Sequence, residues 1–163
     1  MVITEMSKQE CRDLLTRLGF GRLATSHKRQ PYVVPIYFAY DGGRLYGFTT
    51  LGRKVQWMRA NPRVCVEVDE VADPLTWSSV VVLGKYEELP DTAKHKKLRL
   101  RAQALLGKRA RWSRTAHASN QVRGTRQRSN ALFYCIHVNE ISGRKAAKDP
   151  TEWGGNDEYG GEA

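Results

Sequence analysis

Apolar residues at the start of the chain recur with a helical period, which then changes to the period of strands. The helical spacing predicts a helix over Thr4–Leu18, ended by Gly19. Its apolar positions are Met6, Cys11, Leu14, Leu15 and Leu18. After it, Phe20–Ser26 predicts a strand. Tyr32–Tyr40 is a nearly continuous run of β-branched and aromatic residues, which predicts a strand buried on both faces.

Turn and helix signals organise the middle of the chain. Asp41-Gly42-Gly43 predicts a tight hairpin, after which Arg44–Thr50 returns as the partner strand. A short helix is expected over Gly52–Ala60, because Asn61-Pro62 stops it. The middle of the chain therefore predicts a hairpin followed by one short helix.

The second half alternates in the same way between strands and one helix. In chain order it predicts a strand at Arg63–Asp69, a loop at Val71–Thr76, a strand at Trp77–Leu89, a helix from Pro90-Asp91 to Gly107 and a last strand at Ala131–Ile141. Six strands joined mostly by hairpins predict an antiparallel sheet. So much apolar burial in six strands favours closure into a small barrel with helices packed outside, a mainly β (α+β) fold.

Length and composition agree with one folded domain. The 163 residues are 40% hydrophobic and 27% charged, so a wholly disordered chain is not expected. We predict one domain over residues 1–148 and a flexible, Gly-rich tail over 149–163. No apolar run approaches the roughly 20 residues of a membrane helix, and the first residues lack a signal-peptide core. The expected compartment is the cytoplasm, without membrane contact.

The positive charge is concentrated in one segment. Lys94–Arg128 holds 12 Lys and Arg and no acidic residue, whereas the chain as a whole has a formal charge of +10. The remainder is slightly acidic, which makes a nucleic-acid surface spread over the whole fold unlikely on charge grounds. Residues 107–130 read as a basic loop insertion. A mobile surface loop is the favoured interpretation, ahead of a lid that attracts an anionic substrate and of nucleic-acid contact.

Neither cysteine nor histidine spacing predicts a metal site. The three cysteines are Cys11, Cys65 and Cys135, too few and too scattered for a disulfide framework or a zinc site. Cys65 and Cys135 lie in apolar runs and are predicted to be buried thiols. The four histidines are His27, His95, His117 and His137. None has the spacing of a metal ligand, and His137 is predicted to be a hydrogen-bonded histidine of the last strand.

Candidate binding chemistry gathers at Phe48–Lys54, which runs from a strand end into a helix start. A helix start presents unpaired N–H groups and normally attracts acidic residues. Here Arg53 and Lys54 stand in that first turn instead. Cations, hydroxyls and free N–H groups at one point make a candidate site for a phosphate dianion, and the alternative is two solvated basic side chains. The groups that would contact the anion are Thr49, Thr50, Gly52, Arg53 and Lys54.

Other segments, taken together with this one and in their order along the chain, carry a family resemblance. They are Gly21–Thr25, Pro31–Phe38, Asn61–Val64 and Trp77–Gly84. The ordered set resembles the pyridoxamine 5′-phosphate oxidase-like flavin-binding family over roughly Met6–Leu89, and more weakly over Ile136–Lys145. The resemblance implies a six-stranded antiparallel split β-barrel with flanking helices. It also implies a homodimer with flavin mononucleotide (FMN) at the dimer interface.

The resemblance assigns roles to particular positions. Arg53 and Lys54 match the family's flavin-phosphate ligands, and Phe48 and Thr49 match a strand-end pair that lines the flavin. Ser79, with Ser78 beside it, matches a polar position that hydrogen-bonds the flavin. The stretch whose backbone lies along the isoalloxazine ring is Val33, Val34 and Pro35. The residue that packs on the cofactor or across the dimer is Trp77. For the two valines and the tryptophan, plain core or interface packing remains the alternative.

The implied function is an FMN-dependent oxidoreductase of unknown substrate. Several segments look most like the nitroimidazole-resistance branch of the family, so nitroaromatic reduction is one hypothesis. However, Thr49 stands where that branch often has a histidine. Arg144 is a weak match to the C-terminal substrate ligands of the vitamin-making oxidases, which argues against pyridoxal phosphate synthesis. No acid or base stands out. The alternatives are a non-enzymatic flavin carrier or sensor, a deazaflavin- or haem-binding relative, and a basic binding module.

Overall fold

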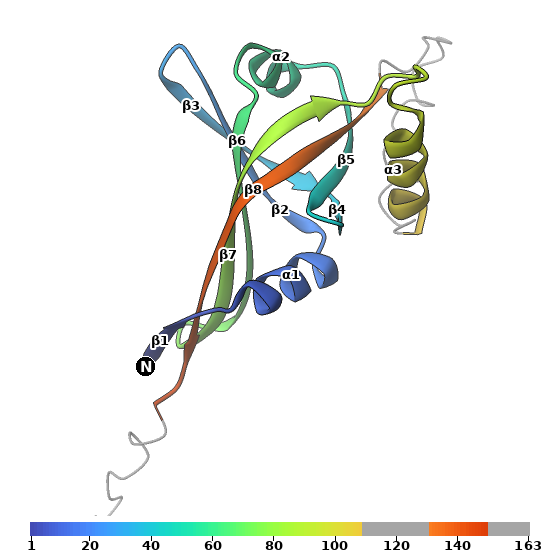
Figure 1. Cartoon of the computed structure of the whole chain (residues 1–163). Coiled ribbons are helices and arrows are strands. Elements are labelled where there is room, and N and C mark those ends of the chain that lie inside the picture. The colour runs from blue at the N-terminus through green and yellow to red at the C-terminus, as the bar shows by residue number, and fades with distance from the viewer. Residues whose placement is uncertain (109–130, 150–163) are drawn as a thin grey trace, which may run out of the picture.

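One antiparallel sheet carries the fold (Figure 1), and the computed structural model describes residues 1–108 and 131–149 of the chain. In these ranges it has eight strands and three helices. In chain order they are β1 (Val2–Glu5), α1 (Lys8–Arg17), β2 (Phe20–His27), β3 (Gln30–Tyr37), β4 (Ala39–Asp41), β5 (Arg44–Thr50), α2 (Arg53–Ala60), β6 (Arg63–Asp73), β7 (Thr76–Glu88), α3 (Lys96–Lys108) and β8 (Ala131–Ala147).

The strand order explains how the sheet closes. It runs β3-β2-β6-β7-β8-β5-β4, and β1 pairs with the far end of β8. The two strands at the ends of this order, β3 and β4, are consecutive in the chain and joined by Phe38, whose side chain is buried and whose N–H donates to the Gly19 carbonyl. The sheet therefore curls until its edges meet, which confirms the predicted β-rich barrel with flanking helices. β1 was not predicted, and β4 is the end of the strand predicted over Tyr32–Tyr40, separated from β3 at Phe38.

Alternation along the strands fills the barrel. On β6, Val64, Val66 and Val68 point inward and are buried, as predicted. Their neighbours across the sheet are equally buried, and α1 closes one end with Cys11, Leu14 and Leu15. The largest fully buried side chain is Tyr134 of β8, which lies at the centre of this core.

The predicted helix over Thr4–Leu18 is shorter in the structure and follows a strand. Ser7 caps α1: its Oγ accepts from the Glu10 N–H, and the Glu10 carboxylate accepts from the Ser7 N–H. This reciprocal capping fixes the helix start at Lys8. Val2–Glu5 instead pairs with β8, so its residues are extended.

Glu10 also couples the start of α1 to the end of the sheet. Lys145 of β8 donates to it at 2.5 Å, and this bond, followed by the Ser7 N–H, lowers the pKa of Glu10 from 4.5 to about 2. A carboxyl with a lowered folded-state pKa stabilises the fold above its unfolded-state pKa, and this contribution is lost as the pH falls through the folded value.

We therefore expect the free energy of unfolding of Glu10→Gln to fall less steeply than that of the wild type as the pH drops from 4.5 to about 2. Urea unfolding midpoints at about pH 6 and about pH 3 measure this. The wild type should lose more stability across that interval than the variant. Equal losses would contradict the role assigned to Glu10.

Three predicted boundaries move, two because strands continue beyond their apolar pattern and one because a helix begins later. β6 continues to Asp73, so the predicted loop at Val71–Thr76 shrinks to a tight turn. β8 continues from Ile141 to Ala147 because β7 and β1 pair with its two sides. α3 begins at Lys96 rather than at Pro90, since residues 90–95 form turns in which Thr92 N–H donates to the Pro90 carbonyl.

The strand predicted over Tyr32–Tyr40 is broken at Phe38, and its β3 part is buried on one face only. Val34 and Ile36 face the core, but Val33 is 60% exposed and Tyr37 is 49% exposed. Pairs across an antiparallel sheet share a face. The outward row therefore continues through Ala24 and Cys65 to Leu83, which is 45% exposed. Cys65 is only half-buried for this reason, contrary to prediction, whereas Cys135 is buried.

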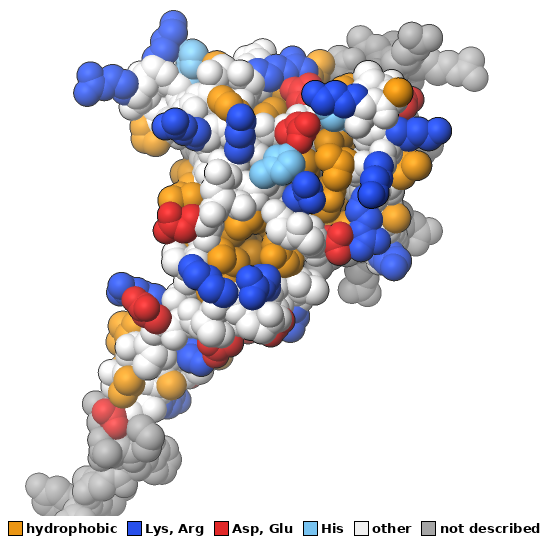
Figure 2. Space-filling model, viewed as in Figure 1, with side chains coloured by type: hydrophobic (Ala, Val, Ile, Leu, Met, Phe, Trp, Pro, Cys, Tyr) orange, Lys and Arg blue, Asp and Glu red, His pale blue; other side chains and the backbone are white. Residues whose placement is uncertain are grey.

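The basic helix α3 is anchored as well as solvated. Its apolar side packs outside the barrel on β4, β5 and β8 through Ala102 and Leu106, and Figure 2 shows Lys and Arg along its exposed side. Arg101 makes a bidentate pair with Asp41, and Arg99 lies over the Phe133 ring. Gly107 and Lys108 belong to this helix rather than to the predicted loop. The rest of that loop, and the predicted tail beyond Asp149, lie outside the described residues.

Among the described residues, no helix combines the length and the apolar character needed to cross a membrane.

Candidate functional site

The start of α2 is an uncapped cationic helix terminus. Gly52 precedes the helix and has no side chain to accept from the first N–H groups, and the first turn contains no acidic residue. The unpaired N–H groups and the helix dipole both favour an anion here. Arg53 and Lys54 occupy that first turn, as predicted.

The two cations of this turn have no carboxylate partner among the described residues. Lys54 is half-buried, and desolvation alone lowers its pKa. Arg53 is exposed and lies over the Tyr32 ring, 5.6 Å from its centroid. Arg59, at the other end of the same helix, instead pairs with Glu88 at 2.5 Å. The first turn therefore holds positive charge that no described side chain neutralises.

The end of β5 brings hydroxyl groups to the same point. Thr49 is half-buried and Thr50 is exposed, and the Thr49 hydroxyl donates to the Thr50 carbonyl at 3.3 Å. Phe48 packs against Phe133 of β8, with the ring centroids 5.1 Å apart. The predicted phosphate-binding residues, from Thr49 to Lys54, thus lie together on one strand end and the helix that follows it.

The predicted ring-binding stretch lies on the adjoining strand. Val33, Val34 and Pro35 belong to β3, and the contact between Arg53 and Tyr32 joins this strand to the start of α2. Val33 and Pro35 are exposed on the outer face, while Val34 packs against the core. The segment predicted to bind the phosphate and the segment predicted to bind the ring therefore adjoin each other at the Arg53–Tyr32 contact.

The remaining predicted residues lie elsewhere. Trp77, Ser78 and Ser79 follow the β6–β7 turn, which lies at the opposite end of the long strands from α2 (Figure 1). The Ser79 hydroxyl donates to Glu67 at 2.9 Å, and Trp77 lines a cavity of about 610 Å³ between β7, β8 and the start of α1. A single chain does not bring these three residues to Arg53 and Lys54.

A larger groove lies on the outer face of the sheet, beside the segment that follows α2. Its volume is about 890 Å³, and its walls come from β2, β6, β7 and the segment after α2. Its lining includes Ala24, Cys65 and Leu83 of the outward row. Thr25 also lines it, and the buried Thr25 Oγ1 has no hydrogen-bond partner in the described part of the chain. The groove therefore combines apolar side chains with polar and basic ones, among them Asn61, Arg63 and Lys85.

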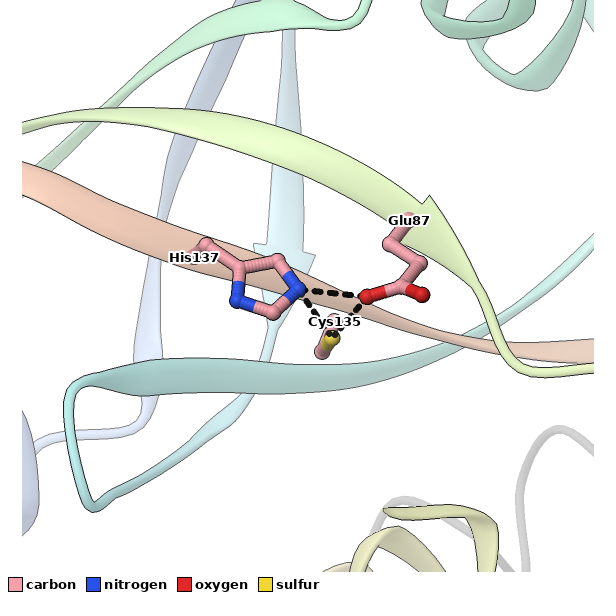
Figure 3. Close-up of side chains that lie close together, drawn as sticks. All are labelled: Glu87, Cys135 and His137. Carbon is pink, nitrogen blue, oxygen red and sulfur yellow. Dashed lines mark hydrogen bonds and ion pairs between the residues drawn. The ribbon is translucent and has the colours of Figure 1, made fainter. Parts of the chain in front are cut away.

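A second constellation, which the sequence did not predict, lies where β7 meets β8 (Figure 3). His137 Nε2 is 2.5 Å from Glu87 Oε2 and 3.6 Å from Cys135 Sγ, and Cys135 Sγ is 3.9 Å from that same Glu87 oxygen. Burial raises the pKa of the Cys135 thiol to about 12, and the bond to His137 lowers the pKa of Glu87. His95 Nε2 lies 3.4 Å from the other Glu87 oxygen.

A local signal for this cluster was present in the sequence. Residues two apart on a strand share a face, so Cys135 and His137 had to point to the same side of β8. Their third partner, Glu87, is distant in the chain and reaches them only because it pairs directly with Cys135 across the sheet. His137 is thus hydrogen-bonded, as predicted, but within a group of potential metal ligands.

Comparison with known families supports the resemblance found in the sequence. A sequence-family model described as pyridoxamine 5′-phosphate oxidase matches residues 7–145. An uncharacterized protein of Rhizobium meliloti (strain 1021) is 37% identical over 146 residues, which cover 90% of this chain and 97% of that protein.

Solved structures share the fold. A FAD-binding protein of Mesorhizobium loti is 41% identical, with a TM-score of 0.74 over 90% of this chain and all of that one. A FAD-binding protein of Mycobacterium smegmatis is 22% identical, with a TM-score of 0.62 over 91% of this chain and 100% of that one. A 5-nitroimidazole antibiotic resistance protein of Bacteroides thetaiotaomicron, 17% identical with a TM-score of 0.61 over 89% of both chains, shares the fold alone.

Proposed function

The chain belongs to the pyridoxamine 5′-phosphate oxidase family, and from this membership we propose that it binds a flavin whose phosphate is held at the start of α2. The observation that carries the proposal is the uncompensated cationic turn: Lys54 is half-buried without an anionic partner in the described chain, beside Arg53 and an uncapped helix start. Partly buried cations are stable when an anion pairs with them, and phosphate supplies one.

The residues present fit a phosphorylated flavin. Arg53, Lys54, Thr49 and the N–H groups after Gly52 would hold the phosphate, and the exposed backbone at Val33 and Pro35 would face the ring. The chemistry that a bound flavin supplies is transfer of a hydride or of single electrons. This chain's residues would bind and orient the cofactor, with its phosphate at the start of α2 and its ring along β3. We propose FMN as the cofactor and an oxidoreductase activity, with nitroaromatic compounds as one candidate substrate class.

We further propose that the protein acts as a homodimer. The outward face of β2 and β3 exposes Phe20, Val33 and Tyr37, each more than 40% exposed. A second copy would cover these apolar side chains. It could also bring Trp77–Ser79 of one subunit to the α2 start of the other, which a single chain cannot do. Sedimentation of the purified protein tests this, and a monomer at micromolar concentration would contradict it.

Titration of the purified, flavin-free protein with FMN, FAD and riboflavin tests flavin binding. We expect FMN to bind at least about tenfold more tightly than riboflavin, because riboflavin lacks the phosphate that pairs with Arg53 and Lys54. Quenching of flavin fluorescence measures each affinity. Equal affinity for FMN and riboflavin would overturn the phosphate site, and no binding of any flavin would overturn the function.

The affinities for FMN and for FAD, compared in the same titrations, show which of these two flavins the protein prefers. Reductant consumption by the flavin-loaded protein, with and without a nitroimidazole, then tests the oxidoreductase activity. Tight binding with no turnover of any acceptor would overturn that activity and leave a flavin carrier.

A further inference from the structure

Three different ligand types converge where β7 and β8 pair beside α3. We propose that Glu87, Cys135 and His137 form a site for a divalent transition-metal ion of the zinc type, with solvent in the fourth position of a tetrahedron. Carboxylate oxygen, thiolate sulfur and imidazole nitrogen are the three donor types that zinc sites in proteins use. The proposal does not depend on flavin binding.

The spacing of the donor atoms matches such a site. Ligands about 2.0–2.3 Å from a tetrahedral zinc ion stand about 3.3–3.6 Å from one another. His137 Nε2 and Cys135 Sγ are 3.6 Å apart, and Cys135 Sγ and Glu87 Oε2 are 3.9 Å apart. Only the hydrogen-bonded pair Glu87–His137 is closer, at 2.5 Å, and it would open by about 1 Å around an ion.

The direction of the contacts separates a metal site from a nucleophilic cysteine. In a Cys–His–carboxylate relay, the thiol and the carboxylate contact opposite nitrogens of the imidazole ring. Here both Cys135 Sγ and Glu87 Oε2 approach the same atom, His137 Nε2 (Figure 3). Three donor atoms that all lie within 4.8 Å of one another surround a point rather than form a line. This arrangement suits an ion at their centre.

His95 lies beside these three ligands and contacts one of them, Glu87. Its Nε2 lies 3.4 Å from Glu87 Oε1, and its Nδ1 lies 2.9 Å from the Thr92 hydroxyl. With Thr92 on one ring nitrogen and Glu87 on the other, His95 would hold the Glu87 carboxylate in position to ligate the ion. The His95 side chain is 15% exposed, whereas those of Glu87 and His137 are about one-third exposed. An ion can therefore enter from the solvent side.

The charges around the cluster are compatible with a divalent ion. Glu87 and a Cys135 thiolate would supply two negative charges. Two cations lie next to the cluster, because Arg44 of β5 and Lys85 of β7 both pair with His137 across the sheet. Their charges oppose a bare cation, so the neutral set of ion, thiolate and carboxylate is the expected form.

Such an ion would fix the ends of β7 and β8 to each other and, through the His95–Glu87 contact, the segment before α3 to both. Glu87 comes from the end of β7, Cys135 and His137 come from β8, and His95 immediately precedes α3. The β7–β8 pairing and the Arg101–Asp41 pair already join these segments, and the ion would add a further link between them. The expected consequence is a fold whose thermal stability depends on the metal.

Cobalt(II) is the probe for the test, because thiolate ligation gives it a sulfur-to-metal charge-transfer band and a tetrahedral site gives it intense visible bands. The full chain is treated with chelator and titrated with Co²⁺, and then with Zn²⁺ to displace it. Difference spectra at fixed flavin content cancel the flavin bands. We expect one ion per chain and a melting temperature about 5 °C or more higher with zinc.

Variants locate the site. Cys135→Ser should abolish the charge-transfer band, Glu87→Gln and His137→Gln should weaken zinc binding at least about 100-fold, and His95→Gln should weaken it about tenfold or more. The matched controls are Cys65→Ser and His27→Gln, which remove the same residue types outside the cluster. Circular dichroism reports folding, and Glu87→Gln decides the matter if Cys135→Ser does not fold. No charge-transfer band in the wild type, or equal loss in a control variant, would overturn the proposal.

Discussion

The double variant Arg53→Ala/Lys54→Ala is expected to bind FMN at least about 100-fold more weakly than the wild type. Each side chain would donate charge-assisted hydrogen bonds to the phosphate, and such bonds contribute about 1.5–3 kcal/mol each. Lys54 contributes further to FMN affinity, because the phosphate would give its half-buried ammonium the anionic partner that the described chain does not provide. Fluorescence titration with FMN measures the loss.

Arg59→Ala is the matched control for this variant. Arg59 belongs to the same helix, but its guanidinium already pairs with Glu88. Its removal should leave FMN affinity within about twofold of the wild type. Riboflavin affinity should change little in either variant, because the lost contacts are to the phosphate. If the double variant bound FMN as tightly as the control does, the phosphate would lie elsewhere on the molecule.

Gly47→Ala is expected to destabilise the fold by about 3 kcal/mol, at the upper end of the usual cost of overpacking. Gly47 of β5 pairs with Tyr134 of β8, and a Cβ at this position would overlap the Cζ and Oη atoms of that ring. Tyr134 is the largest fully buried side chain of the core, and close packing around such a ring opposes its displacement. The expected fall in melting temperature is about 6–12 °C.

Two comparisons make this prediction specific. Gly107→Ala, in α3 where an added Cβ would meet no atom within 4 Å, should be neutral or slightly stabilising. In a Tyr134→Leu background the further cost of Gly47→Ala should shrink, because the smaller side chain leaves room for the methyl group. An unchanged cost in that background would mean that the clash with Tyr134 is not the cause.

Local chemistry explains what could be predicted from the sequence. The Asp41-Gly42-Gly43 turn was predicted correctly because its two glycines supply the positive φ angles of 54° and 76° that a two-residue hairpin requires. The phosphate-binding candidates could be found because Thr49–Lys54 are neighbours in the chain. Family membership was recognisable for a similar reason, since it rests on short segments in a fixed order.

What could not be predicted depends on pairing between distant residues. β1 has no apolar alternation of its own, with all four residues exposed, and exists because β8 pairs with it. The Glu87–Cys135–His137 cluster depends on the β7–β8 register, which includes a shift between Leu83 and Gly84. A one-residue slip would turn Glu87 to the opposite face of the sheet. No spacing within one segment carries that information.

The position of β8 has a consequence for the synthesis of the protein. It lies between β7 and β5 and also pairs with β1. Three strands therefore need β8 as a partner, and β8 is the last described strand to leave the ribosome. At about 5–20 residues per second, the nascent chain exposes the unpaired edges of β5 and β7 for several seconds. Premature termination before Ala131 would leave those edges open for good. Truncated chains should therefore depend on chaperones or aggregate. In the complete chain, β8 pairs with β5 and β7 and covers both edges.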